Sequence, residues 1–159
     1  MSPAQTITSP YMGCVSWDPS DELVFPAGLP GFEQERRMLP VEIPAHRPLV
    51  YLQSLDRADI CFLTLPVFTI DPSFSLHLSD DERQVLQLGK HVGDEAAPAI
   101  GVDVLCLAML VPCGKTVEAN LNAPVVINLH NFRAIQSVAS GVSARVLRLS
   151  DAGSWVIVC

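Results

Sequence analysis

The chain has 159 residues, of which 49% are hydrophobic and 17% are charged, a balance that indicates a compact globular domain and excludes an intrinsically disordered protein. Its formal net charge of −7 is concentrated in the first half, because residues 1–82 carry 12 acidic and 4 basic side chains. An acidic surface repels nucleic-acid phosphate and speeds encounter with a basic protein. We therefore expect no direct nucleic-acid partner.

Thirteen Pro and nine Gly residues are spread along the chain, which is typical of short elements separated by turns and favours a mostly β domain. The five Cys residues show no paired spacing of the kind found at zinc sites, and their odd number fits a reduced, cytoplasmic compartment. Cys61 and Cys106 lie in apolar runs and are expected to pack in the core. The longest apolar run, Val104–Val111, has eight residues. A membrane helix needs roughly 20, and no charged segment typical of a signal peptide begins the chain, so no membrane association is expected.

Residues 1–16 show no periodicity, so we predict a loosely ordered N-terminal tail, followed by a single domain over residues 17–159. A first strand is predicted at Glu22–Phe25. The next segment, Pro26–Glu33, holds two Pro and two Gly residues and demands a chain reversal with defined backbone angles.

Three further strands are predicted in the first half of the chain. Residues 39–43 alternate apolar side chains with Pro and Glu, which indicates an edge strand, since Pro cannot donate to a central ladder. Leu49–Leu55 and Ile60–Leu65 are apolar runs joined by a short polar segment, which predicts a β-hairpin.

One clear helix is predicted, at Ser79–Gly89, with a capping box at its start, acidic residues in its first turn and a glycine at its end. The connector Lys90–Val102 leads to a continuous apolar strand, Val104–Val111, which we expect to be buried on both faces or inside a barrel. Three short strands are predicted near the C-terminus: Ile135–Ala139, Arg145–Leu149 and Trp155–Cys159.

The segment Thr116–Asn128 changes abruptly from polar turn residues to a β-branched apolar run. Asn120 and Asn122 favour a specified turn, because Asn side chains bond neighbouring backbone groups, and Pro124 holds the preceding residue extended. We predict a loop that feeds a buried strand at Val125–Asn128. Two interpretations stay open: a structural corner, or a binding surface with exposed Asn side chains.

The sequence offers no catalytic constellation, and we expect no enzyme, no metal and no cofactor. The four His residues, at positions 46, 77, 91 and 130, lie singly without ligand spacing. Gly114–Thr116 resembles part of a phosphate-binding loop, but Met109 occupies the position of its first glycine. One alternative stays open: a small-ligand-binding barrel or an enzyme with Cys113 as the nucleophile.

Three segments in order, Gly28–Glu33, Leu52–Leu55 and Asn120–Asn128, make the chain similar to a known family. From about Val24 to about Gln136 it resembles the bacterial flagellar assembly factor FliW family. The resemblance implies a small, single-domain, antiparallel, barrel-like fold with one or two short helices and no enzymatic activity.

The resemblance also implies two protein partners, the translational regulator CsrA and flagellin. CsrA is a basic RNA-binding repressor of flagellin translation. In the family's scheme, a FliW protein bound to CsrA frees flagellin mRNA for translation, and flagellin that is not exported captures the FliW protein and restores repression.

We expect the loop Glu118–Pro124, together with acidic residues of the first half of the chain, to contact the basic partner. Alanine at Asn120 or Leu121 is expected to weaken binding and to leave the melting temperature nearly unchanged. Asn122 departs from the family pattern, in which an apolar residue is common there, and the pattern fades beyond Gln136. A structural module that has lost its flagellar partners is therefore a third interpretation. The candidate partner-binding residues are Glu118, Asn120, Leu121, Asn122, Pro124 and Asn128.

Overall fold

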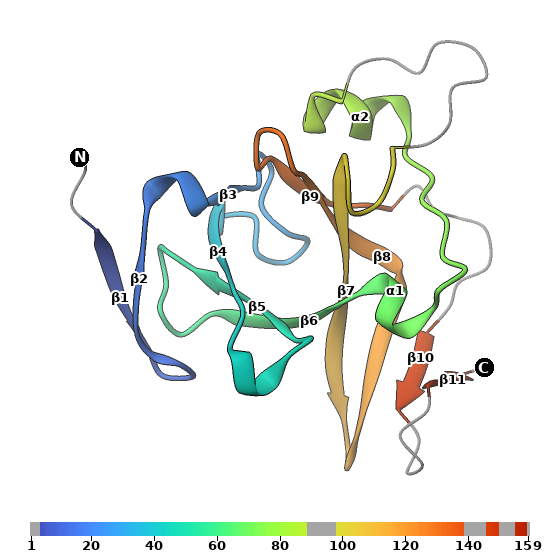
Figure 1. The fold of residues 1–159 in the computed structure, drawn as a ribbon, viewed down its shortest axis with the longest axis horizontal. Coiled ribbons are helices and arrows are strands. Elements are labelled where there is room, and N and C mark those ends of the chain that lie inside the picture. Colours follow the sequence, from blue (N-terminus) through green and yellow to red (C-terminus); the bar gives the residue numbers. More distant parts are fainter. Residues whose placement is uncertain (1–3, 89–97, 139–145, 150–154, 159) are drawn as a thin grey trace.

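The computed structural model describes residues 4–88, 98–138, 146–149 and 155–158. Within these residues nine strands form one antiparallel sheet, in the order β11-β10-β8-β7-β6-β5-β4-β3, with β9 also paired to β8 (Figure 1). The separate hairpin β1–β2 forms a second sheet. The strands are β1 (Gln5–Ser9), β2 (Gly13–Trp17), β3 (Leu23–Val24), β4 (Arg37–Val41), β5 (Val50–Ser54), β6 (Cys61–Pro66), β7 (Val104–Cys113), β8 (Thr116–Asn128), β9 (Ala134–Gln136), β10 (Val146–Leu149) and β11 (Trp155–Val158). The helices are η1 (Pro19–Asp21), η2 (Pro44–His46), α1 (Val67–Ile70) and α2 (Asp80–Leu86).

The sheet curls until one end approaches its middle. The N–H of Val24, in the end strand β3, donates to the carbonyl oxygen of Phe132, 3.0 Å away, in the segment between β8 and β9. Val24 also forms an isolated parallel bridge with Arg133. The predicted mostly β, antiparallel, barrel-like fold with short helices is therefore confirmed.

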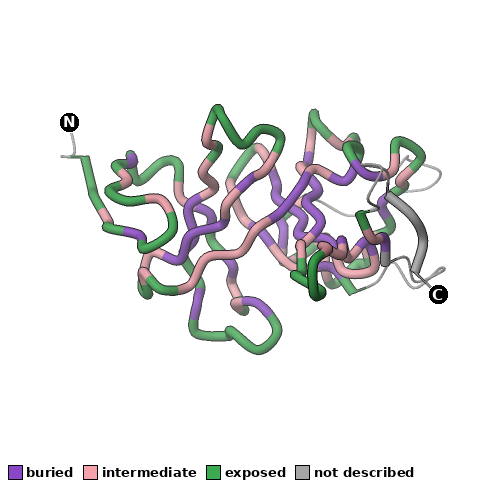
Figure 2. Tube along the Cα trace, turned by 90° about the horizontal axis from the view of Figure 1, so that it is seen from below, coloured by how far each residue is buried: buried purple, intermediate pink, exposed green. Residues whose placement is uncertain are grey.

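The first half of β7 and the segment Val125–Ile127 of β8 are apolar on both faces, and successive side chains there enter different clusters. Figure 2 shows buried positions gathered along the middle of the trace. The inner cluster, inside the barrel, comprises Leu23, Phe25, Leu29, Met38, Val50, Leu52, Leu107, Val125, Ile127 and Ala134. The outer cluster, under α1 and α2, comprises Leu65, Val67, Ile70, Leu76, Leu86, Val104, Cys106, Ala108, Ala119, Leu121, Val126 and Leu147. Burial on both faces is confirmed for the first half of β7, whereas Val111 near its end is 53% exposed.

Strands β5 and β6 form the predicted hairpin, and a buried amide fixes its turn. The side chain of Gln53 is fully buried. Its Nε2 donates to the carbonyl oxygens of Ser54, Ala58 and Ile60 at 3.0, 3.0 and 3.1 Å. Because buried donors need partners, the turn backbone and this side chain stabilise each other.

Strand β4 is an edge over its second half, as predicted. The carbonyl oxygen of Arg37 accepts from Leu55 N–H at 3.1 Å. Because backbone groups alternate in direction along a strand, the N–H and C=O groups of the odd-numbered residues of β4 point toward β5. Pro40 faces the other side, where β3 pairs only with Arg37 and Met38. The missing N–H of Pro40 therefore costs no ladder bond.

The segment Pro26–Glu33 makes the predicted chain reversal. Phe32 N–H donates to Leu29 O at 2.7 Å, which closes a tight turn. Pro30 occupies its second position and Gly31, with φ +83°, its third. This combination is typical of a type II turn, which requires positive φ at the third position.

Helix α2 begins as predicted and ends differently. Glu82 N–H donates to Ser79 Oγ at 3.1 Å, and Ser79 N–H donates to Glu82 Oε1 at 3.2 Å, so the capping box is confirmed. The left-handed residue that ends the helix is Gln87, with φ 59°. The predicted glycine, Gly89, lies outside the described residues.

The N-terminal residues form a hairpin, so the predicted loose tail over residues 1–16 is wrong for its described part. Strands β1 and β2 pair with Gln5 opposite Trp17. Tyr11 Oη donates to Asp59 O at 2.8 Å, and Trp17 Nε1 donates to Glu22 Oε1 at 2.9 Å. Apolar periodicity gives no signal here because most of these side chains are exposed, and an isolated hairpin depends on such tertiary contacts.

The C-terminal strand predictions are largely confirmed. Strands β10 and β11 fall within the two last predicted strands. The strand predicted at Ile135–Ala139 is shifted and short, because β9 ends at Gln136. Most of the connector predicted at Lys90–Val102 lies outside the described residues.

We predict that Gly28→Ala destabilises the fold more than Gly31→Ala, although both glycines have positive φ. A Cβ at Gly28 would lie 2.5 Å from Glu33 Cα, whereas nothing lies within 4 Å of one at Gly31. Gly31→Ala should lower the free energy of unfolding by about 1 kcal/mol, because alanine is strained at left-handed backbone angles. Gly28→Ala should lower it by about 3 kcal/mol or more. Urea denaturation followed by circular dichroism measures both; equal losses would contradict the role of the Glu33 contact.

We predict that Glu22→Gln destabilises the protein at neutral pH but not in acid. Glu22 accepts from Trp17 Nε1 and from Arg37 Nη2, 3.0 Å away, and the hydrogen bond from Arg37 holds the pKa of its carboxyl below the usual 4.5. A carboxyl whose pKa is lower in the folded than in the unfolded protein stabilises the folded state at pH values above its unfolded pKa. This stabilisation is lost as the pH falls through the folded-state pKa. The difference in unfolding free energy should be about 1 kcal/mol at pH 7 and vanish in strong acid. A pH-independent difference would rule out the charge of Glu22 as its cause.

Candidate functional site

Strand β8 contains an irregular stretch at its centre. Its pairing with β7 passes from Val125 opposite Leu107 to Asn120 opposite Met109, so β8 carries extra residues between these pairs. Asn120 Oδ1 accepts from Asn122 N–H at 2.9 Å, which confirms the predicted side-chain-to-backbone bond. The predicted loop is wrong, because pairing with β7 resumes on both sides and keeps β8 one strand.

Burial divides the six candidate residues. Leu121 is 4% exposed and belongs to the outer cluster, and Pro124 is also buried. Glu118, Asn120 and Asn122 are half-buried and occupy alternate positions of the strand. The expectation that Leu121→Ala leaves the melting temperature unchanged is therefore wrong, because this change opens a cavity in the core.

Glu118 is held by Arg148 of the neighbouring strand β10. Arg148 Nε donates to Glu118 Oε1 at 3.2 Å, and Arg148 Nη2 donates to the same oxygen. The hydrogen bond from Arg148 lowers the pKa of the Glu118 carboxyl, so Glu118 is ionised at neutral pH. The charges of Glu118 and Arg148 cancel each other. This part of β8 therefore adds little to the negative charge of the protein surface.

Asn128 has a structural role at the end of α2. It is 3% exposed, and its Nδ2 donates to Leu86 O at 2.8 Å, while its Oδ1 accepts from His130 N–H at 2.9 Å. Arg133 Nε donates to Val85 O at 2.7 Å. The last carbonyls of a helix lack intrahelical partners, and a cation there is favourable. The segment after β8 therefore caps α2.

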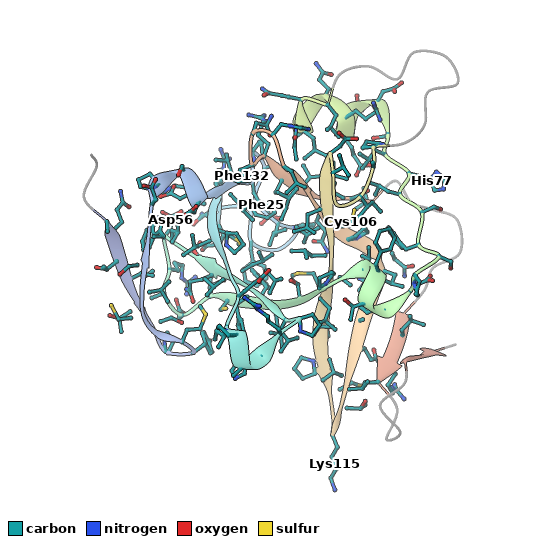
Figure 3. All side chains as sticks on the ribbon, in the orientation of Figure 1. Phe25, Asp56, His77, Cys106, Lys115 and Phe132 are labelled. Carbon is teal, nitrogen blue, oxygen red and sulfur yellow. The ribbon has the colours of Figure 1, made fainter. Side chains whose placement is uncertain are left out.

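The cysteines differ in their exposure. Cys113 is exposed on the β7–β8 turn, 4.0 Å from Arg148 Nη2, and Lys115 projects from the tip of that turn (Figure 3). Apolar side chains of the inner cluster fill the barrel interior. Core packing is confirmed for Cys106, whose burial raises the pKa of its thiol to about 12; Cys61 is half-buried, with a pKa of about 11.

Within the described ranges no group of three or more His, Cys, Asp or Glu side chains is placed to hold a metal ion. Nor does any helix in this part of the chain have the length and apolar character needed to cross a membrane. The described histidines have separate partners: His46 lies against Tyr51, His77 against Ser75 and His130 against Asp103. His91 lies outside the described residues.

Sequence reasoning missed a groove between the turn Pro26–Glu33, α2 and β9, which we call the α2 groove. The carboxylate residues Glu33, Asp81 and Glu82 line it together with apolar side chains. No local motif reveals the groove, because it joins three segments that are far apart in the sequence. The acidic excess of the first half is the one signal that points to it.

We predict that Asn128→Ala lowers the free energy of unfolding by about 2 kcal/mol, because it leaves Leu86 O with only a 3.4 Å contact from Asn131. Asn120→Ala removes a half-exposed local bond and should cost less than about 1 kcal/mol. Thermal and urea denaturation compare the two variants. A larger loss for Asn120→Ala would contradict the capping role of Asn128.

Comparison with known proteins identifies the family. A family model described as FliW protein matches residues 6–147, a span that begins inside β1. The flagellar assembly factor FliW of Oceanobacillus iheyensis is 33% identical over 132 residues, covering 83% of this chain and 84% of that protein. The one from Anoxybacillus flavithermus is 34% identical over 125 residues, covering 78% and 79%. A crystal structure of the flagellar assembly factor FliW matches with a TM-score of 0.74 at 25% identity, covering 88% of this chain and 92% of that one. The chain therefore belongs to the flagellar assembly factor FliW family.

Proposed function

We propose that this protein is a non-enzymatic regulator of flagellar assembly that acts in the cytoplasm by binding proteins. Its two partners are a CsrA-type translational regulator and flagellin. Bound to the regulator, it frees flagellin mRNA for translation; captured by flagellin that has not been exported, it lets repression return. The observation that carries this proposal is the match of the FliW family model to residues 6–147.

The charge distribution supports a basic partner. Three of the four basic side chains in residues 1–82 are engaged by acids: Arg37 with Glu22 and Asp56, Arg47 with Glu42, and Arg57 with Asp59. Residues 1–82 hold 12 acidic side chains against four basic ones, so this half of the chain keeps a net negative charge. Such a surface attracts an RNA-binding protein, whose own surface is basic, and does not attract RNA itself.

The proposed contact on β8 consists of its half-buried side chains, Glu118, Asn120 and Asn122. Leu121 and Pro124 are buried beneath them and shape the irregular stretch. Amide side chains on a rigid strand offer directional hydrogen bonds with little ordering cost, which suits a recognition surface.

We predict that the purified protein forms a complex with the CsrA-type protein of its own organism. The complex should appear on size-exclusion chromatography at micromolar concentrations. Its affinity, measured by calorimetry, should fall about tenfold when the ionic strength rises from about 0.05 M to about 0.5 M, because salt screens the acidic surface. The absence of a complex at low salt would contradict the proposed function.

The same titration tests the contact on β8. Replacing Asn120 and Asn122 together by alanine should weaken the complex about tenfold, equivalent to about 1.4 kcal/mol, and leave the protein folded. Gln5→Ala, an exposed amide on β1, is the matched control and should bind like the wild type. If the double variant also binds like the wild type, β8 lies outside the interface.

A further inference from the structure

The α2 groove is an open depression with an apolar floor. It has a volume of about 460 Å³ and is bordered by Gly28 and Pro30 of the tight turn, Val85 of α2 and Ile135 of β9. Val138, at its end, is 73% exposed. This size accommodates one or two large side chains, and covering such a surface removes apolar area from water.

The rim of the groove is acidic. Glu33, Asp81 and Glu82 line it, and among the residues that the structure describes no Lys or Arg lines it. Asp80, the neighbour of Asp81, adds a further carboxylate to the same helix turn. Clustered like charges around a low-dielectric floor focus the field and favour a cationic ligand.

Two of these carboxylates are fixed in place. Glu82 Oε2 accepts from Val138 N–H at 2.9 Å, and Glu82 Oε1 accepts from Ser137 Oγ at 3.1 Å. Glu33 Oε1 accepts from Gly31 N–H at 3.1 Å, and backbone hydrogen bonds lower the pKa of its carboxyl. Both groups are therefore oriented before any ligand arrives, which reduces the ordering cost of binding.

We propose that the α2 groove binds a segment of a partner protein that presents one or two large apolar side chains flanked by lysine or arginine. The apolar floor takes the anchor side chain, and the carboxylates of Glu33, Asp81 and Glu82 pair with the flanking cations. An acidic or a purely polar segment does not match this combination. The inference uses only the chemistry of the groove and stands independently of the proposed CsrA-type partner.

The test uses three short synthetic peptides labelled with fluorescein. The first is helical, with leucine on one face and lysine on the other; the second has glutamate in place of lysine; the third permutes the first so that no apolar face remains. Anisotropy titrations should show the first binding at least tenfold more tightly than the other two. Amide chemical-shift changes should gather at residues 27–33, 81–85 and 135–138.

Variants of the groove locate the binding. Asp81→Lys and Val138→Asp should each weaken the first peptide at least fivefold, since both positions line the groove. The matched controls are Asp59→Lys and Val111→Asp, an exposed acid and an exposed valine elsewhere, which should bind within twofold of the wild type. Circular dichroism melting confirms that each variant is folded.

Equal binding of the lysine and glutamate peptides, shift changes elsewhere, or wild-type affinity of both groove variants would overturn the inference. None of these results bears on the complex with a CsrA-type protein, which is measured separately with the intact partner. Failure of the groove and failure of the proposed function are therefore distinguishable.

Discussion

The antiparallel pairing of β7 with β8 is the constraint on which the rest of the structure depends. Where the first half of β7 pairs with the end of β8, both strands are apolar on both faces. Each face is therefore covered by other elements: the curled sheet β3–β6 on the inside, and α1, α2 and β10 on the outside. Helices of four and seven residues have little stability of their own in water. They persist here because the outer cluster buries their apolar side chains. The curled sheet and the short helices thus both cover apolar faces of the β7–β8 hairpin.

Features encoded within a few residues could be predicted from the sequence, and features that join distant segments could not. The turn at Pro26–Glu33 and the start of α2 follow from glycine, proline and capping chemistry, and the β5–β6 hairpin follows from two apolar runs joined by a short polar segment. Bonding of an Asn side chain to the backbone in this stretch was also predicted and is seen between Asn120 and Asn122 N–H, but the surrounding element was predicted as a loop. Its continuity depends on pairing with β7, β9 and β10, which a local pattern does not contain.

The candidate site shows the same division. Asn128 stands in one of the three segments that resemble the FliW family, yet its side chain caps α2, 42 positions away in sequence, and does not face solvent. Gln53 fixes a turn from inside the sheet, and Gly28 leaves room for the backbone of Glu33. A residue can therefore carry a family resemblance because it maintains the fold. Burial and bonding separate these residues from Glu118, Asn120 and Asn122, whose side chains are half-buried and form the contact that we propose on β8.

Helix α2 links the structural residues to the acidic surface. The end of β8 and the segment after β9 hold the two ends of α2: Asn128 bonds Leu86 in the last turn, and Ser137 and Val138 bond Glu82 in the first. A seven-residue helix with free ends would fray, and its carboxylates would sample many positions. Because both ends are tied to the sheet, Asp81 and Glu82 keep a fixed relation to the apolar floor beside them. The bonds that stabilise this corner of the fold are thus the same bonds that give the α2 groove a defined shape and charge.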